Sequence, residues 1–170
     1  MPWPSSDVAG AWPAGLAREE AVVRFEASVR IARPAAEVFA YLRDKHRVVQ
    51  DPGSPVLVLE KLTPGDVGVG TRFREVVRML PGVRGEIRST VTRCERDRAL
   101  EEDFAGAGLR GHLTYGFRAE GDGTRLVQRQ TLELAWWLWP LRPLVRCAFA
   151  RRLRERLDDI AARLARPGSA

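Results

Sequence analysis

The feature that most constrains this chain is a change of hydrophobic period close to Pro140. Before it, apolar residues recur at every second position in several short segments, which is typical of strands with one buried face. After it, apolar residues recur at helical spacing over residues 145–164, which predicts one long helix with a single apolar stripe. A run of strands followed by such a helix favours an α+β fold in which a sheet covers the stripe.

The segments before Pro140 predict strands in hairpin succession. One short helix is expected over residues 35–42, after Pro34, and a second over 45–49. We therefore expect a curved antiparallel sheet of about seven strands wrapped around the C-terminal helix, with two short helices after the first strand and a cavity between sheet and helix. The strands are expected at residues 21–31, 56–62, 71–79, 85–95, 100–104, 109–119 and 124–136.

The length of 170 residues predicts one domain over residues 20–166, because two halves would each be too small to bury a good core. Residues 1–19 hold prolines and glycines with little periodicity, so we expect an extended or poorly ordered arm there and a tail at 167–170. No secretory signal is expected, and the most apolar stretch, 132–145, is too short and interrupted to span a bilayer. These features predict a cytoplasmic protein.

The composition excludes several kinds of chemistry. With His46 and His112 as the only histidines, a three-histidine metal site is excluded, and we expect no metal and a solvated His112. With Cys94 and Cys147 as the only cysteines, no disulfide framework can form, and both thiols are expected to pack in the core. The glycines of residues 65–70 lack the Lys-Ser/Thr of a phosphate loop, so no cofactor is expected.

The charge of the chain is carried almost entirely by arginine. Basic residues number 28 against 22 acidic ones, a formal net charge of +6, and only Lys45 and Lys61 are lysines. An excess of basic residues can bind nucleic acid or an anionic membrane surface. A nucleic-acid site needs a concentrated basic face with aromatic residues between the charges. We interpret the arginines of 151–156 as a solvated helix face and expect no nucleic-acid partner.

Three motifs carry a family resemblance. An apolar strand, a proline and an acid-Val-Phe helix start occupy residues 29–44, Gly68-Val69-Gly70-Thr71 enters a later strand, and Gly121-Asp122-Gly123 forms a hairpin turn before the late helix. Over residues 20–165 this order resembles the START-like (SRPBCC) superfamily, in particular its polyketide cyclase/dehydrase-type branch. The resemblance implies the helix-grip fold and a small hydrophobic ligand, such as a lipid, isoprenoid or polyketide, in the cavity.

Strand alternation predicts which side chains face that cavity. Glu75, Glu102 and Tyr115 share faces with apolar residues, and a buried carboxylate with a raised pKa could act as a general acid or base. We therefore name these three as catalytic candidates for a cofactor-free cyclase or dehydratase. A bulge would turn them outward, and pairing with helix arginines is an alternative. The candidate ligand contacts are Phe73, Val77, Met79, Phe104, Leu113, Tyr115, Phe117, Gln128, Gln130, Leu132, Trp136, Val145 and Phe149.

The densest aromatic feature is Trp136-Trp137-Leu138-Trp139, where the last strand meets the long helix. It could form a lid over a flat ligand, contact a membrane interface with Arg142 and Arg146 at the headgroups, or cap the core with some tryptophans exposed. Three function classes stay open: a binding protein for a small apolar ligand, a cofactor-free enzyme, and an interaction module that forms a homodimer or docks a partner.

Overall fold

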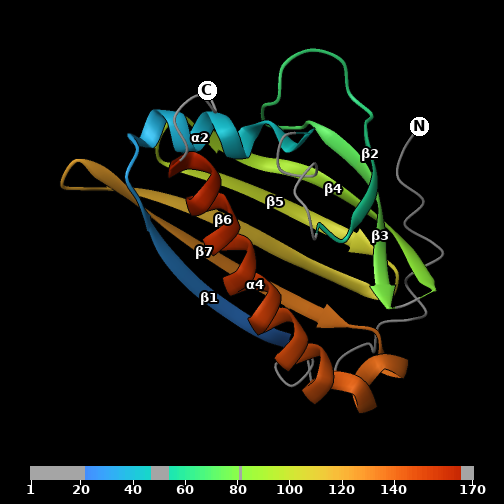
Figure 1. Cartoon of the computed structure of the whole chain (residues 1–170). Coiled ribbons are helices and arrows are strands. Elements are labelled where there is room, and N and C mark those ends of the chain that lie inside the picture. Colours follow the sequence, from blue (N-terminus) through green and yellow to red (C-terminus); the bar gives the residue numbers. More distant parts are fainter. Residues whose placement is uncertain (1–21, 47–53, 81, 166–170) are drawn as a thin grey trace.

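The computed structural model describes residues 22–46, 54–80 and 82–165, with the side chains of residues 79 and 80 outside the description (Figure 1). Seven strands precede a short 3-10 helix and the long helix α4. The elements are β1 Val22–Ile31, α2 Ala35–Arg43, β2 Val56–Lys61, β3 Arg72–Leu80, β4 Val83–Glu95, β5 Ala99–Gly106, β6 Leu109–Glu120, β7 Gly123–Leu134, η2 Trp136–Leu141 and α4 Arg142–Ala165.

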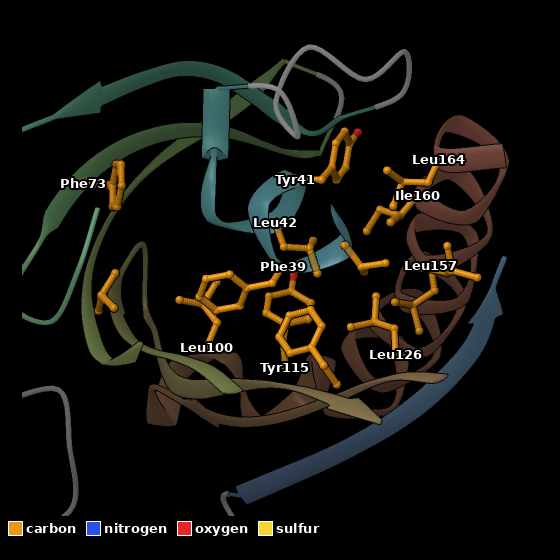
Figure 2. Packing of buried hydrophobic residues seen from close by; sticks show 14 residues of the cluster. Phe39, Tyr41, Leu42, Phe73, Leu100, Tyr115, Leu126, Leu157, Ile160 and Leu164 are labelled. Atoms are coloured by element: carbon orange, nitrogen blue, oxygen red, sulfur yellow. The ribbon is translucent and has the colours of Figure 1, made fainter. Parts of the chain in front are cut away.

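The seven strands form one antiparallel sheet in the order β1-β7-β6-β5-β4-β3-β2. Strands β2 to β7 follow one another as hairpins, and β1 adds to the free edge of β7, so the first and last strands of the chain lie side by side. The sheet curves around the buried apolar cluster and α4 (Figure 2). The α+β expectation and the seven antiparallel strands are confirmed.

Helix α4 lies against the sheet through one stripe. Leu153, Leu157, Ile160 and Leu164 are buried at spacings of three and four residues, which places them on one face of the helix. Phe149, one turn earlier, stacks on Phe25 of β1 with ring centroids 6.0 Å apart. Burial of each large apolar side chain contributes about 1.5–3 kcal/mol, so this stripe holds the helix on the sheet.

Helix α2 closes the end of the sheet near the C-terminus of α4 (Figure 1). Its apolar face buries Val38, Phe39, Tyr41 and Leu42 in the same cluster as the last turns of α4. Phe39 meets Phe117 of β6 edge to face, with centroids 5.5 Å apart, a favourable arrangement for aromatic rings. Lys45 and His46 are helical, and the rest of the second predicted helix, 47–49, lies outside the described residues, as do 1–19 and 167–170.

Two expectations are wrong. The last strand ends at Leu134 rather than at Trp136, because Leu134 pairs with Leu109, the first residue of β6, and the ladder has no partner beyond it. Trp136 therefore belongs to η2. Pro140 lies in the same 3-10 helix and has no N–H to donate to a neighbouring strand. Cys147 is exposed, because it lies between the stripe positions of α4, whereas Cys94 packs against the core as expected.

Candidate functional site

A buried ion cluster lies on the concave face of the sheet. The ammonium of Lys45 donates to Glu75 Oε1 and to Ser89 Oγ, each at 2.9 Å, and forms an ion pair with Glu102. The three acceptors match the three N–H groups of the ammonium. The same Nζ lies 4.6 Å from the centroid of the Phe73 ring, a cation–π contact. We call Lys45, Glu75, Ser89 and Glu102 the lysine cluster.

Sheet register brings the acceptors of the lysine cluster together. Glu75 lies on β3, Ser89 on β4 and Glu102 on β5, and all three side chains point to the concave face. Bulges do occur, between Val91 and Arg93 in β4 and between Arg78 and Leu80 at the end of β3, but neither lies between a carboxylate and the strand residues that predict its direction. The side chain of Glu75 is 17% exposed and that of Glu102 only 5%. The inward placement of both carboxylates is therefore confirmed.

The electrostatics of the lysine cluster keep Lys45 charged. Burial lowers the pKa of Lys45, but the charges and hydrogen bonds of Glu102 and Glu75 outweigh burial, so its pKa lies above the usual value. An amine must be neutral to act as a nucleophile or base. Lys45 therefore serves as a fixed cation that orients the two carboxylates.

Tyr115 and Gln128 form a second polar group on the same face. They stand directly opposite each other on β6 and β7, and each is at most 3% exposed. Neither Tyr115 Oη nor Gln128 Oε1 has a hydrogen-bond partner among the described residues. Burial raises the pKa of the Tyr115 phenol, and Arg156 opposes this only in part, so the hydroxyl keeps its proton. The pair offers a donor and an acceptor inside an apolar cluster.

The structure divides the other candidate contacts between two apolar clusters. Phe73, Phe117 and Leu113 belong to the cluster that holds Tyr115, and Val77 is also buried. Phe104, Leu132, Val145 and Phe149 belong to the second cluster, beside η2. Gln130 is half-buried, and the side chain of Met79 lies outside the description. Ligand contact by these residues stays a prediction.

Trp136 is not part of either apolar cluster among the described residues. Its side chain is 59% exposed, because the chain leaves the sheet before it. Its expected place on the inner face of the last strand is therefore wrong.

Sequence reasoning missed Lys45 and Ser89. The expected partners of the carboxylates were arginines, yet the cation is one of only two lysines among 28 basic residues. A lysine in a chain that otherwise uses arginine was the one signal in the sequence that pointed to Lys45. A compact ammonium with three donors fits among three acceptors, where a planar guanidinium does not. Alternation could not find Lys45, since it lies outside the strands.

The convex face of the sheet carries His112 and a surface groove. His112 Nδ1 lies 2.7 Å from Asp103 Oδ1, and the His112 side chain is 40% exposed, as the solvated interpretation predicts. A shallow groove of about 430 Å³ surrounds it, lined by charged and polar side chains such as Arg88, Arg110 and Glu133. Among the described residues, no three His, Cys, Asp or Glu side chains gather as metal ligands. No helix in the described part of the chain could cross a membrane.

The concave sheet, the covering helix and the polar groups between them define a START-like (SRPBCC) architecture. The sequence model of the family described as polyketide cyclase/dehydrase and lipid transport matches residues 22–165, so the chain belongs to this family. No protein of curated function matches the chain in sequence.

Solved structures share the fold at low identity. The di-domain ARO/CYC protein BexL from the BE-7585A biosynthetic pathway is 21% identical with a TM-score of 0.71, covering 87% of this chain and 52% of that one. A START superfamily protein from Mycobacterium smegmatis is 15% identical with a TM-score of 0.69, covering 84% and 96%. Ara h 8.0201 is 14% identical with a TM-score of 0.66, covering 84% and 97%. At these identities the likeness establishes the fold alone.

Proposed function

We propose that the chain binds a small, mainly hydrophobic ligand that carries a hydroxyl or enol group, in a cavity between the concave face of the sheet and α4. Family membership implies a hydrophobic ligand. The observation that carries the finer proposal is the Tyr115–Gln128 pair, whose buried hydroxyl and amide oxygen lack partners among the described residues. Buried polar atoms in proteins are nearly always hydrogen-bonded, so such a pair supports a ligand or water contact.

The chemistry of the pair selects the polar end of the ligand. Tyr115 can donate and Gln128 Oε1 can accept, so one hydroxyl on the ligand can satisfy both. The lysine cluster on the same face holds two carboxylates and one ammonium, a negative formal balance. A ligand carboxylate would add a further negative charge to this face. Neutral alcohols, phenols and enols are therefore favoured over fatty-acid anions.

The first test is native mass spectrometry of freshly purified protein, followed by extraction and identification of any bound compound. Titrations with a naphthol and its methyl ether then measure the contribution of the hydroxyl. Tyr115→Phe should weaken naphthol binding about fivefold to tenfold, the value of one net hydrogen bond, and leave ether binding unchanged. Equal losses for both probes, or no binding of either probe to the wild-type protein, would refute the proposal.

The matched control is Tyr41→Phe, which removes the hydroxyl of the only other tyrosine. The Tyr41 hydroxyl points away from the apolar cluster, whereas that of Tyr115 points into it (Figure 2). Tyr41→Phe should therefore leave the preference for naphthol intact. Without ligand, Tyr115→Phe should not lower the free energy of unfolding, because it removes a buried hydroxyl without a partner.

A second candidate function is cofactor-free proton transfer on a polyketide-type ligand. The observation that favours it is the buried Glu102, held by Lys45 on the concave face that also carries the Tyr115 phenol. A carboxylate base with a phenol donor could carry out enolisation, aldol cyclisation or dehydration. Glu75→Gln and Glu102→Gln should abolish turnover while ligand binding persists. Unchanged turnover in both variants would exclude this role.

A further inference from the structure

We propose that the corner formed by η2 and the start of α4 docks on the surface of an anionic lipid bilayer. This corner, residues 136–144, is named the tryptophan corner. It lies at one end of the molecule, drawn in orange where α4 begins, away from α2 (Figure 1). The proposal is independent of which ligand the interior binds.

The tryptophan corner exposes large apolar side chains along one continuous segment. The exposed fraction is 59% for Trp136, 52% for Trp137, 46% for Leu141 and 63% for Leu144. Single exposed apolar residues are ordinary, but a contiguous group of this kind marks an interaction site. Amphipathic indole rings favour the headgroup level of a bilayer, and leucines favour the acyl boundary below it.

Two tryptophans of the corner, Trp137 and Trp139, are held in place by contacts with the sheet. Trp139 Nε1 donates to the Leu134 carbonyl at 3.3 Å. The ring of Trp137 lies on Gly108, where an added Cβ would come within 2.5 Å of it. Leu138 fills the inward position and is 9% exposed. The rings of Trp137 and Trp139 are therefore held in place, so little of their side-chain entropy is lost when a surface covers them.

The charge around the corner matches an anionic surface. Residues 135–154 contain no aspartate or glutamate. The same stretch carries Arg142, Arg146, Arg152 and Arg154, together with Arg151, which pairs with Glu155 just beyond the stretch at 3.5 Å. Basic side chains beside an interfacial apolar group are attracted to anionic headgroups, and the attraction falls within a Debye length.

The charge and the leucines of the corner disfavour two other occupants. A two-fold contact between copies of the chain would bring two sets of these arginines together, and like charges opposed across an interface are repelled. A nucleic-acid strand could stack on the tryptophans but gives Leu141 and Leu144 no apolar partner. A bilayer accommodates all three side-chain types at their preferred depths.

Vesicle flotation tests this docking. The probes are vesicles of phosphatidylcholine alone and of phosphatidylcholine mixed with phosphatidylglycerol, each at low and high salt. The intact protein should float with the mixed vesicles at low salt, float less at high salt, and stay behind with phosphatidylcholine alone. Brominated lipid should quench its tryptophan fluorescence. Absence of flotation with mixed vesicles at low salt would overturn the proposal.

Matched variants locate the contact. Arg146→Gln should weaken vesicle binding about fivefold, and Arg146→Gln/Arg152→Gln about 25-fold. The control Arg118→Gln should have no effect, because Arg118 lies on β6 at the end opposite to the tryptophan corner. Trp136→Ser/Leu144→Ser should abolish flotation, with Val69→Ser, another exposed apolar position, as control. If the controls weaken binding as much as the corner variants, the corner is not the docking surface.

Sedimentation without lipid separates the remaining outcome. The wild-type protein should sediment as a monomer. A dimer that Trp136→Ser/Leu144→Ser dissolves, together with absence of flotation, would assign the corner to a second copy of the chain and overturn the bilayer proposal. If that double variant does not fold, the arginine variants and the quenching of the intact protein still decide the question.

Discussion

The two faces of the sheet use the same charged chemistry in opposite ways. On the convex face, arginines pair with carboxylates in water, as in Arg74 with Glu86 at 2.9 Å and Arg125 with Glu120 at 2.6 Å, with side chains 37–45% exposed. On the concave face a single lysine holds two carboxylates, and none of these three side chains is more than 17% exposed.

The difference shows where charge matters energetically. An exposed pair gains little, because water screens it and two long side chains lose freedom. A buried cluster has lost hydration that only its own partners replace, so removal of one partner leaves an uncompensated charge. The convex pairs therefore keep the sheet hydrated, while the lysine cluster sets the polarity of the interior.

The largest expected effect follows from removing the concave cation. Lys45→Met leaves Glu75 and Glu102 facing each other without a counter-charge, so we expect a loss of about 3–5 kcal/mol in the free energy of unfolding. Urea denaturation measures it. Arg74→Ala on the convex face is the control and should stay close to wild type. If the free energy of unfolding fell equally in the two variants, the two faces would not differ in the way proposed.

Removal of all three concave charges should be much milder than removal of one. In Lys45→Met/Glu75→Gln/Glu102→Gln no charge is left buried, and neutral replacement of buried ion clusters is often tolerated. We expect stability within about 2 kcal/mol of wild type, well above the single Lys45→Met variant, because interacting sites are not additive. A triple variant less stable than Lys45→Met would mean that shape, not charge, dominates the cluster.

A smaller loss is expected at Ser89. Its Oγ accepts one of the three hydrogen bonds of Lys45, and Ser89→Ala should lower the free energy of unfolding by about 1–2 kcal/mol. Ser28→Ala, which removes a hydroxyl from an exposed contact with Arg125, is the convex counterpart and should change little. The two denaturation midpoints measured side by side compare the faces directly.

The smallest expected effects are on the pH dependence of stability, to which the two faces contribute at opposite ends of the pH scale. The hydrogen bonds of Arg74 lower the pKa of Glu86, and those of Arg125 lower the pKa of Glu120, each below the usual 4.5. Their stabilisation is thus present above 4.5 and lost as pH falls through the lowered values. The raised pKa of Lys45 acts oppositely: its stabilisation is present below 10.5 and lost as pH rises through the folded value.

Thermal unfolding as a function of pH checks these signs. Glu86→Gln/Glu120→Gln should flatten the acid limb and leave the alkaline limb unchanged, and the neutral triple variant, which removes the Lys45 ammonium, should flatten the alkaline limb. Added salt should reduce the acid effect, because those carboxylates are exposed to solvent. An acid limb that Glu86→Gln/Glu120→Gln leaves unchanged, or an alkaline limb that the triple variant leaves unchanged, would contradict these signs.

The sequence by itself determined which way the strand side chains point. Alternation with period two placed Glu75, Glu102, Tyr115 and Gln128 on the concave face, because successive residues of a strand point to opposite sides wherever the register is regular. The sequence also predicted the apolar stripe of α4, because burial of one helix face requires apolar residues at spacings of three and four.

Only the tertiary structure decided what lies opposite those side chains. Lys45 reaches the carboxylates from a segment after α2 that is 30 residues from Glu75 in sequence, a pairing that no local pattern encodes. Trp136 left the predicted strand because β6 begins at Leu109 and offers β7 no further partner. Local periodicity reports the direction of a side chain, whereas its partner depends on how distant segments pack.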